Sequence, residues 1–403
     1  MIIFMSNGKK LSDHDNSLFR TVCMLDLRIL KVYTSGAMSQ QRGKTYLDIL
    51  RLVAIFLVVF NHTNGFYYSS YSGGADWGYW GLLLQNQVVK MAVPLFFVVS
   101  GALLLTKEES ISELWKKRIL RFIVVFFIIA VVQYAFFCYW NVESFSPSHI
   151  YKLVYCNLGE HNNFYAHWFL YAYVGMLIML PFLRIVAKNI TVRLFAYLFG
   201  VQVLFCCTLP VLSLCLGKYM AYSGFNDWIP FHQESKSLPF AAGYCAFYVL
   251  MGYVLEHKIS IDAWNKYRFK AILSAMGCLV AGCICMEVTR RLQGVSAPNE
   301  SWVFLTSFIP LPCAVVYMEL KSVCMRVNLA PVLKRIIASL GGAVFTVMLI
   351  ENLFRVGWEP YIEEMEEVIG RLPAAWMSAV MICLASLVVG LLLRKIPYVN
   401  RVF

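Results

Sequence analysis

Three ionisable side chains lie at helical spacing in one apolar stretch, "DILRLVAIFLVVFNH", residues 48–62. At 100° per residue, Arg51 and His62 fall on the same face of a helix, about 16 Å apart along its axis. Asp48 precedes Arg51 by one turn and can pair with it. Imidazole titrates near neutral pH and can accept a proton, whereas guanidinium binds phosphates and carboxylates. The stretch therefore combines a potential general base with a potential anion-binding group.

A simpler interpretation needs no chemistry at all. The residues between Arg51 and His62 are almost entirely apolar, as in a membrane span, and ionisable groups are costly near lipid. Arg51 would then extend to the inner interface, and His62 would lie where the helix ends at the outer one. The spacing alone favours this interpretation, so other segments must decide.

The composition is that of a membrane protein. The 403 residues are 60% hydrophobic and only 14% charged, and the mean hydropathy is +0.64. A soluble domain of this length is less apolar. The 13 cysteines contain no CxxC pair with metal-ligand spacing and lie mostly within apolar runs, so we expect neither a metal site nor a disulfide framework.

Apolar runs of about 20 residues recur along the chain, and each is long enough to cross a bilayer as a helix. We therefore expect an all-α polytopic membrane protein, a bundle of about ten transmembrane helices. The expected spans are roughly 46–65, 83–105, 119–140, 165–184, 194–216, 238–256, 269–289, 302–320, 336–355 and 374–393.

Basic residues favour one side of these spans. With the N-terminus inside, most Lys and Arg fall in the inner connections, and the outer connections hold only Lys152, Lys218, Lys236, Arg290, Arg291 and Arg371. The outer connection "WEPYIEEMEE" is acidic. The positive-inside rule then predicts that both termini are cytoplasmic. This distribution explains most of the formal net charge of +12 without nucleic acid as a partner.

Two parts of the chain differ in character. Residues 1–37 are mixed and polar, and we expect an N-terminal extension there, either a non-native start or a disordered tail. Met38 begins "MSQQRGKTYLDILR" and looks like a natural start. Residues 38–403 form the expected membrane domain.

Several later segments share their order and spacing with one known family. They are "VPLFFVVSGALL" at 93–104, the Arg-x-x-Arg pair Arg118 and Arg121, "HWFL" starting at His167, and "FYVLMGYVL" at 247–255. Together with the Asp, Arg and His of the first span, they resemble membrane acyltransferase family 3, whose members O-acylate cell-surface sugars. The resemblance covers roughly residues 38–400.

The resemblance implies a donor and an acceptor. The donor would be a cytoplasmic acyl-CoA, most simply acetyl-CoA, and the acceptor a hydroxyl of an envelope glycan or lipid-linked sugar. The chain would then be an O-acetyltransferase of the bacterial inner membrane. No permanently bound cofactor is expected, and the bilayer, the donor and the glycan are the expected partners.

Roles for individual residues follow from this resemblance. His62 and Arg51 would be catalytic, with His62 acting as general base or as a covalent acyl carrier. Arg118 and Arg121, one turn apart, would clamp the donor phosphates; otherwise they only anchor the topology. Substrate contacts would come from Asp48, His167 and Trp168, although the last two also suit an interfacial aromatic belt.

The ninth span departs from the family pattern. It reads "VMLIEN", with Glu351 where the family usually has His, and Glu351 could simply pair with Arg355 four residues later. The rival function is export of a polysaccharide or lipid-linked sugar without acyl transfer, because intramembrane Arg and His also occur in transporters. We see no inverted repeat in the sequence.

Overall fold

The structure is a computed structural model that describes residues 45–63, 77–139, 146, 168–215, 242–293 and 307–395. Helices form nearly all of these residues, and the described part of the chain contains no strand, in agreement with the expected all-α class. The first half contains α2 (Thr45–His62), α3 (Trp77–Val89), α4 (Ala92–Leu104), α5 (Ile111–Leu114), the π-helical turn η2 (Trp115–Ile119), α6 (Leu120–Tyr139) and α8 (Trp168–Asn189). The second half contains α9 (Val192–Val203), η4 (Leu204–Thr208), α10 (Leu209–Cys215), α12 (Ala242–His257), α13 (Ile261–Gln293), α15 (Pro310–Arg326), α16 (Pro331–Ile369) and α17 (Arg371–Leu393).

Within the described residues, eight segments are long and apolar enough to cross a membrane. They are Thr45–His62, Trp77–Leu104, Ile111–Tyr139, Ala172–Asn189, Val192–Leu212, Ile261–Val288, Pro331–Ile369 and Leu372–Leu393. Each of the ten expected spans overlaps a helix, but α12 and α15 have only 16 and 17 described residues. The chain is thus a multi-pass membrane protein, and the count of ten stays a prediction.

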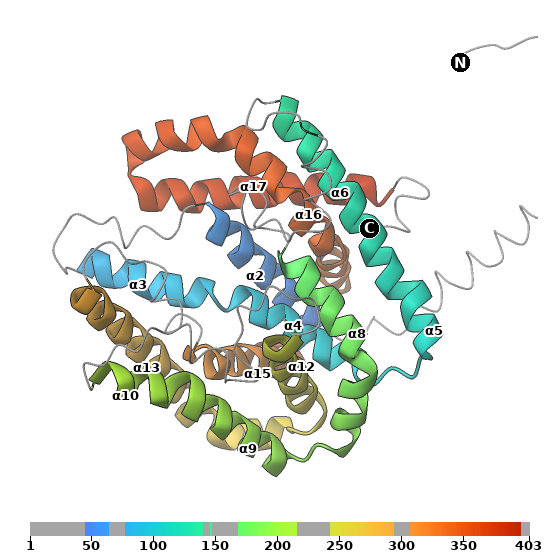
Figure 1. Cartoon of the computed structure of the whole chain (residues 1–403), viewed down its shortest axis with the longest axis vertical. Coiled ribbons are helices and arrows are strands. Elements are labelled where there is room, and N and C mark those ends of the chain that lie inside the picture. Colours follow the sequence, from blue (N-terminus) through green and yellow to red (C-terminus); the bar gives the residue numbers. More distant parts are fainter. Residues whose placement is uncertain are drawn as a thin grey trace, which may run out of the picture. The chain divides into compact units, whose positions relative to one another are not determined.

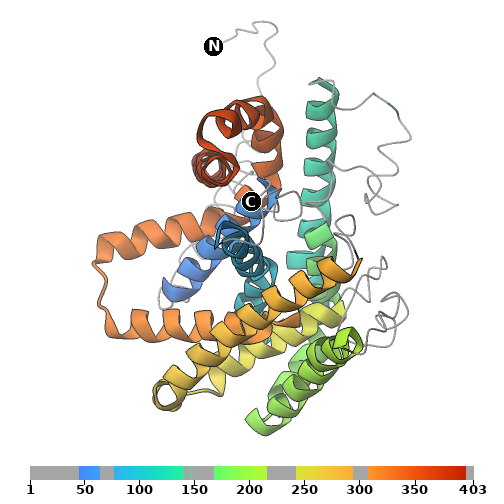
Figure 2. The same ribbon diagram turned by 90° about the vertical axis from the view of Figure 1, so that its left-hand side faces the viewer.

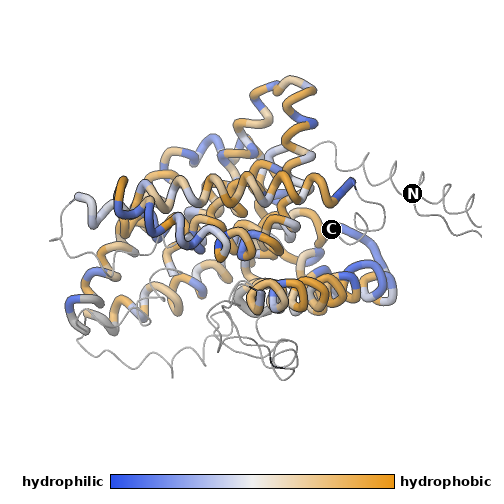
Figure 3. Tube along the Cα trace, turned by 90° about the horizontal axis from the view of Figure 1, so that it is seen from above, coloured by the Kyte–Doolittle hydropathy of each residue, from blue (hydrophilic) through white to orange (hydrophobic). Residues whose placement is uncertain are grey.

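The helices expose large apolar side chains on their outward faces. Figure 3 shows long hydrophobic stretches along the helices. On α6 the exposed residues include Ile123, Val124, Phe127, Ile128 and Val132, and on α17 they include Met377, Val380, Leu384 and Val388. Exposed apolar surface on this scale suits contact with lipid rather than water.

The helix α2 lies in the middle of the bundle, between the α16–α17 pair and α4 (Figure 1, Figure 2). Leu50, Ile55, Val59 and Phe60 are fully buried, so most of its surface packs against neighbouring helices. This packing fixes the position of any chemical group that α2 carries.

The α4 and α12 helices cross with their backbones in contact. A Cβ atom on Gly101 would overlap the carbonyl of Val249, and one on Gly252 would overlap the carbonyl of Val98. Only glycine permits this approach, as in many membrane helix pairs. Gly101 and Gly252 therefore allow the two helices to pack closely.

The segment expected as one span at 83–105 is two helices. The chain turns at Lys90 and Met91, between α3 and α4. Pro94 has no N–H to donate to the carbonyl of Lys90, and its ring crowds that carbonyl, so a continuous helix would be broken there. The acidic segment expected as an outer loop also differs, because it continues α16 as helix as far as Ile369.

Helix ends that were expected on the same side of the membrane contact one another. Tyr46 Oη donates to Glu256 Oε2 at 2.7 Å, joining the start of α2 to the end of α12. Arg394 Nη1 donates to the carbonyl of Ser339 at 3.2 Å, joining the end of α17 to the first part of α16. The alternation of the expected spans agrees with these contacts, whereas the side that faces the cytoplasm stays a prediction.

Candidate active site

The helix α2 carries Arg51 and His62 without interruption between them. Their side chains are 22% and 24% exposed, so each is partly open. Three helical turns separate the two groups, about 16 Å along the axis. The one-face arrangement inferred from the spacing therefore exists on a single rigid element.

His62 is bonded to a buried carboxylate. Its Nδ1 lies 2.7 Å from Oε1 of Glu351 on α16, and the Glu351 side chain is only 1% exposed. Oε2 of Glu351 is buried and has no hydrogen-bond partner among the described residues. An ionised Glu351 accepts the proton on Nδ1, which leaves the lone pair of His62 on Nε2. A carboxylate in this place also stabilises an imidazolium, so the pair has the chemistry of a general base with its orienting group.

The pairing of Glu351 with Arg355 suggested by the sequence is wrong. The Glu351 carboxylate points toward α2, and Arg355 Nε instead donates to Asn352 Oδ1 at 3.0 Å. The reason lies in packing: Glu351 and Asn352 are both buried inside the bundle, and a buried carboxylate needs a polar partner within that interior.

A lysine lies close to the His62 end of α2. Lys90 Nζ donates to Asn61 Oδ1 at 2.9 Å, next to His62 in the chain. The break between α3 and α4 places Lys90 there. Gln133 on α6 donates to the carbonyl of Leu349 at 2.8 Å and so ties α6 to α16 just before Glu351. Polar groups from α6, α16 and the α3–α4 connection thus lie near this end of α2, inside the apolar bundle.

The Arg51 end of α2 also packs on α16. Arg51 Nη1 donates to Asp48 Oδ1 at 2.9 Å, which confirms the predicted ion pair. A Cβ atom on Gly341 would lie 2.7 Å from the Cβ of Asp48, so the two helices approach closely here. With Asp48 beside Gly341 at one end and His62 beside Glu351 at the other, α2 and α16 run in the same direction.

Arg118 belongs to a three-residue charge network. Its Nε donates to Oε1 and Oε2 of Glu109 at 2.9 and 3.2 Å. Arg184 on α8 donates from Nη2 to the same Oε1 at 2.7 Å. Arg184 is also held by the carbonyl of Leu104 at the end of α4, at 3.2 Å from both Nε and Nη2. One carboxylate thus bridges two guanidinium groups from different helices.

Local sequence explains how this network is positioned. Ser110 and Glu113 form a capping box that starts α5 directly after Glu109. Arg118 lies in the π-helical turn η2, an irregular turn of the kind often found at functional sites.

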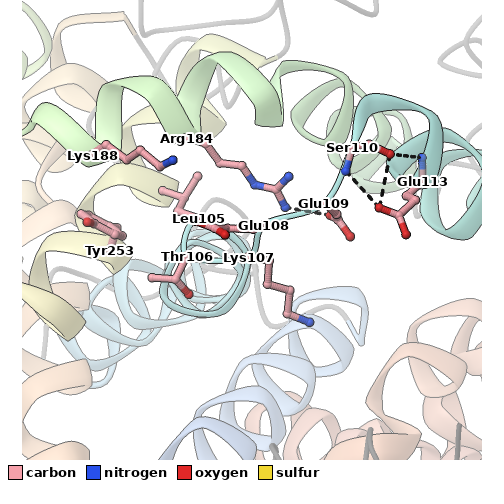
Figure 4. A pocket seen from close by; sticks show the side chains of 10 residues that line it. All are labelled: Leu105, Thr106, Lys107, Glu108, Glu109, Ser110, Glu113, Arg184, Lys188 and Tyr253. Carbon is pink, nitrogen blue, oxygen red and sulfur yellow. Dashed lines mark hydrogen bonds and ion pairs between the residues drawn. The ribbon is translucent and has the colours of Figure 1, made fainter. Parts of the chain in front are cut away.

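A cavity of about 610 Å³ opens beside the network (Figure 4). It is lined by Leu105, Thr106, Lys107, Glu108, Glu109, Ser110, Glu113, Arg184, Lys188 and Tyr253. Arg184 and Lys188 come from α8, Tyr253 comes from α12, and the connection between α4 and α5 supplies most of the others. The cavity therefore combines side chains of both charges with the apolar surface of Leu105 and Tyr253.

Electrostatics in this region reflect a local excess of cations. Partial burial lowers the pKa of Lys107, and the nearby charges of Arg118, Arg184 and Arg51 lower it further, more than Glu109 raises it. Partial burial alone would raise the pKa of Glu109, but its bonds to Arg184 and Arg118 outweigh that effect and hold the pKa below its usual value. Glu109 is therefore ionised at neutral pH. The charge of Arg51 is among those that lower the pKa of Lys107, which indicates that the Arg51 end of α2 faces this region.

The structure brings together some of the residues predicted from the sequence. Asp48 and Arg51 lie at one end of α2 and His62 at the other, while Arg118 joins the cavity through Glu109. Arg121 follows in α6 and does not line the cavity. His167 lies outside the described residues, and Trp168 is the first residue of α8, so its side chain is not described.

Sequence reasoning missed several residues of these two regions. They are Lys90, Lys107, Glu109, Arg184 and Lys188. Lys90 carried a signal, because a lysine within an expected span, four residues before a proline, indicates a polar interior contact. The others appeared as ordinary interfacial charges, and only the packing of α8 against the start of α6 reveals their common position.

Comparison with known families decides the assignment. A family model described as an acyltransferase domain matches residues 44–395. The chain belongs to membrane acyltransferase family 3. Searches among curated proteins and among solved structures find no significant match. The match covers both ends of α2, the charge network and the cavity, so this acyltransferase carries all of them within its family domain.

Proposed function

We propose that this membrane acyltransferase moves an acyl group, most simply acetyl, from acyl-CoA to a hydroxyl of a cell-envelope glycan. The enzyme would lie in the bacterial inner membrane, with the donor on the cytoplasmic side and the glycan on the other. The observation that carries the proposal is the bond of 2.7 Å between His62 Nδ1 and Glu351 Oε1. This bond would orient a general base at the end of a membrane span, where the span itself has no structural need for one.

The donor would bind at the Arg51 end of α2. CoA carries several phosphate charges, and Arg51, Lys107, Arg118, Arg184 and Lys188 supply cations in that region. Guanidinium groups suit phosphate oxygens because they donate two parallel hydrogen bonds. The pantetheine arm is an extended chain, and it would carry the thioester along the face of α2 toward His62.

At the other end of α2, Nε2 of His62 would take the proton of the glycan hydroxyl. The hydroxyl oxygen would attack the thioester carbonyl, forming the new C–O bond. The C–S bond would then break, and the leaving CoA thiolate would take the proton back from the imidazolium. Glu351 would hold the ring in place and offset the positive charge that develops on it. Lys90, held beside His62 through Asn61, would favour the negative charge on the carbonyl oxygen.

The test is acyl transfer by the purified full chain in nanodiscs. Acetyl-CoA labelled in the acetyl group is supplied with envelope glycan from cells that lack this protein. Label in the glycan, together with release of free CoA, is expected. A polysaccharide exporter would consume no acetyl-CoA and leave the glycan unlabelled, and that outcome would remove the proposal. Glycan mass in cells with and without the protein then identifies the acyl group, since each transferred acetyl adds its own mass.

A further inference from the structure

Glu109 holds an unusual position for an acidic residue. It lines the cavity and its side chain is only 12% exposed, yet its carboxylate accepts hydrogen bonds from both Arg118 and Arg184. Arg184 would keep its place without Glu109, because it also donates twice to the carbonyl of Leu104. The bridging position between the two guanidinium groups is therefore a preformed site for an anionic oxygen.

The charges around the cavity conflict with a polyanionic donor. The cationic side chains that line it are Lys107, Arg184 and Lys188, and the anionic ones are Glu108, Glu109 and Glu113. The lining side chains alone would offer a phosphate as much negative as positive charge, and the cationic excess of the region comes from Arg118 and Arg51 outside the lining. The phosphate would also find Arg118 and Arg184 already hydrogen-bonded to the carboxylate of Glu109. Like charges at close range cost free energy, so the donor binds well only if one carboxylate moves away.

Glu109 can move without loss of helical structure. It lies in the connection between α4 and α5, where residues 107–110 are not helical. Its backbone precedes the capping box of Ser110 and Glu113, which would remain intact. The move therefore costs little beyond the two ion pairs themselves.

We propose that Glu109 is an internal occupant of the donor's phosphate site, and that phosphate oxygens of acyl-CoA displace its carboxylate from Arg118 and Arg184. The inference rests on the proposed function, because it takes the cavity as the donor site. When CoA leaves, the carboxylate returns and closes the two ion pairs again. A small monoanion competes poorly with a tethered carboxylate, whereas a ligand with several phosphates gains contacts with Lys107 and Lys188 as well. Glu109 would thus select polyanionic donors and promote release of CoA.

The test compares CoA binding to the full chain in nanodiscs of neutral phosphatidylcholine. Glu109→Gln keeps the shape of the side chain but removes its charge. It should tighten CoA binding roughly fivefold, because CoA no longer has to break the partly exposed ion pairs of Glu109. Glu319→Gln is the matched control, because Glu319 also pairs with an arginine, Arg268, but does not line the cavity. It should change affinity less than twofold. Arg184→Gln should weaken binding in both the wild-type and the Glu109→Gln background.

The outcomes separate the inference from the proposed function. If wild type binds CoA but Glu109→Gln binds it more weakly, or no more tightly than Glu319→Gln does, Glu109 orients the arginines and the inference is overturned. If wild type does not bind CoA at all, the donor step of the proposed function fails as well. Should Glu109→Gln not fold, Glu109→Asp serves instead, since its shorter side chain loosens both ion pairs and should also tighten binding.

A lipid headgroup carries the same phosphate chemistry, so the lipid is varied as well. The titrations are repeated in nanodiscs that contain anionic phosphatidylglycerol. Donor occupancy predicts that the gain from Glu109→Gln persists. If phosphatidylglycerol abolishes that gain, a lipid phosphate takes the site and the assignment to the donor is wrong.

Discussion

The two ends of α2 are built on different principles. At the His62 end, one imidazole meets one carboxylate, and the carboxylate is 1% exposed. At the Arg51 end, cations from α8 and the connection after α4 line a cavity of about 610 Å³, and Arg118 of η2 shares Glu109 with Arg184. The first arrangement depends on a single pair, whereas the second distributes its charge over several groups.

This difference matches what each proposed task requires. Proton transfer needs one group at one place, and an error of an ångström in its position is costly. Binding of several phosphates needs many charges, and each of them contributes a modest share. A single substitution at the His62 end should therefore remove most of the transfer activity, whereas each substitution at the Arg51 end should weaken donor binding only in part.

His62→Ala is expected to have the largest effect on the acyl-transfer rate. Loss of a general base typically costs 10² to 10⁴ in rate, so we expect a loss of about 10³-fold. Affinity for CoA should change less than twofold, because the phosphates bind at the other end of α2. Rate and affinity are measured on the same nanodisc preparation.

The control for His62→Ala is Thr63→Val. Thr63 directly follows the same helix and donates to the carbonyl of Ala375, so Thr63→Val disturbs local packing without removing the imidazole. It should keep most of the activity. Acylation near the wild-type level in His62→Ala would leave His62 as an ordinary interfacial residue.

Gly101→Ala tests the scaffold between the two ends. The new methyl group would overlap the backbone carbonyl of Val249, and neither backbone can yield without separating α4 from α12. We expect a loss of about 3 kcal/mol of stability, because overpacking of a tight contact costs this much. Transfer rate and CoA affinity should then fall together with the amount of folded protein, as measured by thermal unfolding in detergent.

Gly81→Ala is the matched control for the scaffold. Gly81 lies in α3, and a Cβ atom there would have no neighbour within 4 Å. The substitution should be neutral or should stabilise the helix by roughly 0.5 to 1 kcal/mol, since alanine is the better helix former. If Gly101→Ala unfolds at the same temperature as Gly81→Ala, the close crossing of α4 and α12 is not required.

Glu351→Gln tests the pair at the His62 end directly. The amide has nearly the same shape and can still accept a hydrogen bond, but it cannot offset a charge on the imidazole. We expect the transfer rate to fall roughly 100-fold, because loss of the carboxylate behind a catalytic histidine is costly in comparable sites. Glu351→Asp should recover part of the rate, since the charge returns at a longer distance. A rate in Glu351→Gln equal to wild type would show that the pair only holds α2 against α16.

The sequence predicted the helices well but the positions of the helix breaks poorly. Apolar runs predicted helices at every expected span, because the bilayer demands about 20 apolar residues for each crossing. The same criterion could not locate the break at Lys90. Helix breaks inside a span depend on how neighbouring helices satisfy the freed backbone groups, which a single segment does not show.

At the site, contacts within one helix could be predicted and contacts between helices could not. The pairing of Asp48 with Arg51 follows from the helical period alone. The pairing of His62 with Glu351 joins residues 289 positions apart, and it depends on the parallel packing of α2 on α16. Glu351 therefore looked like a partner of Arg355, its nearest cation in sequence. The same reason hid Glu109 and Arg184, which meet only through tertiary structure.

Arg118→Lys should have the smallest effect, and it tests the distributed character of the Arg51 end. Lysine keeps the charge but loses the Nε–H that Arg118 shares between both oxygens of Glu109, and it loses the planar fork by which arginine would contact a phosphate. We expect the KM for acetyl-CoA to rise roughly tenfold, while kcat stays within twofold, because the other cations still hold the donor.

Lys117→Gln is the control: it removes a whole charge next to Arg118, but Lys117 pairs with Glu113 and should leave KM nearly unchanged. If Arg118→Lys changes kcat more than KM, Arg118 takes part in the chemistry and the two ends of α2 are not separate in function. If neither parameter moves, charge alone suffices at this position, and Arg118 serves membrane topology rather than the donor.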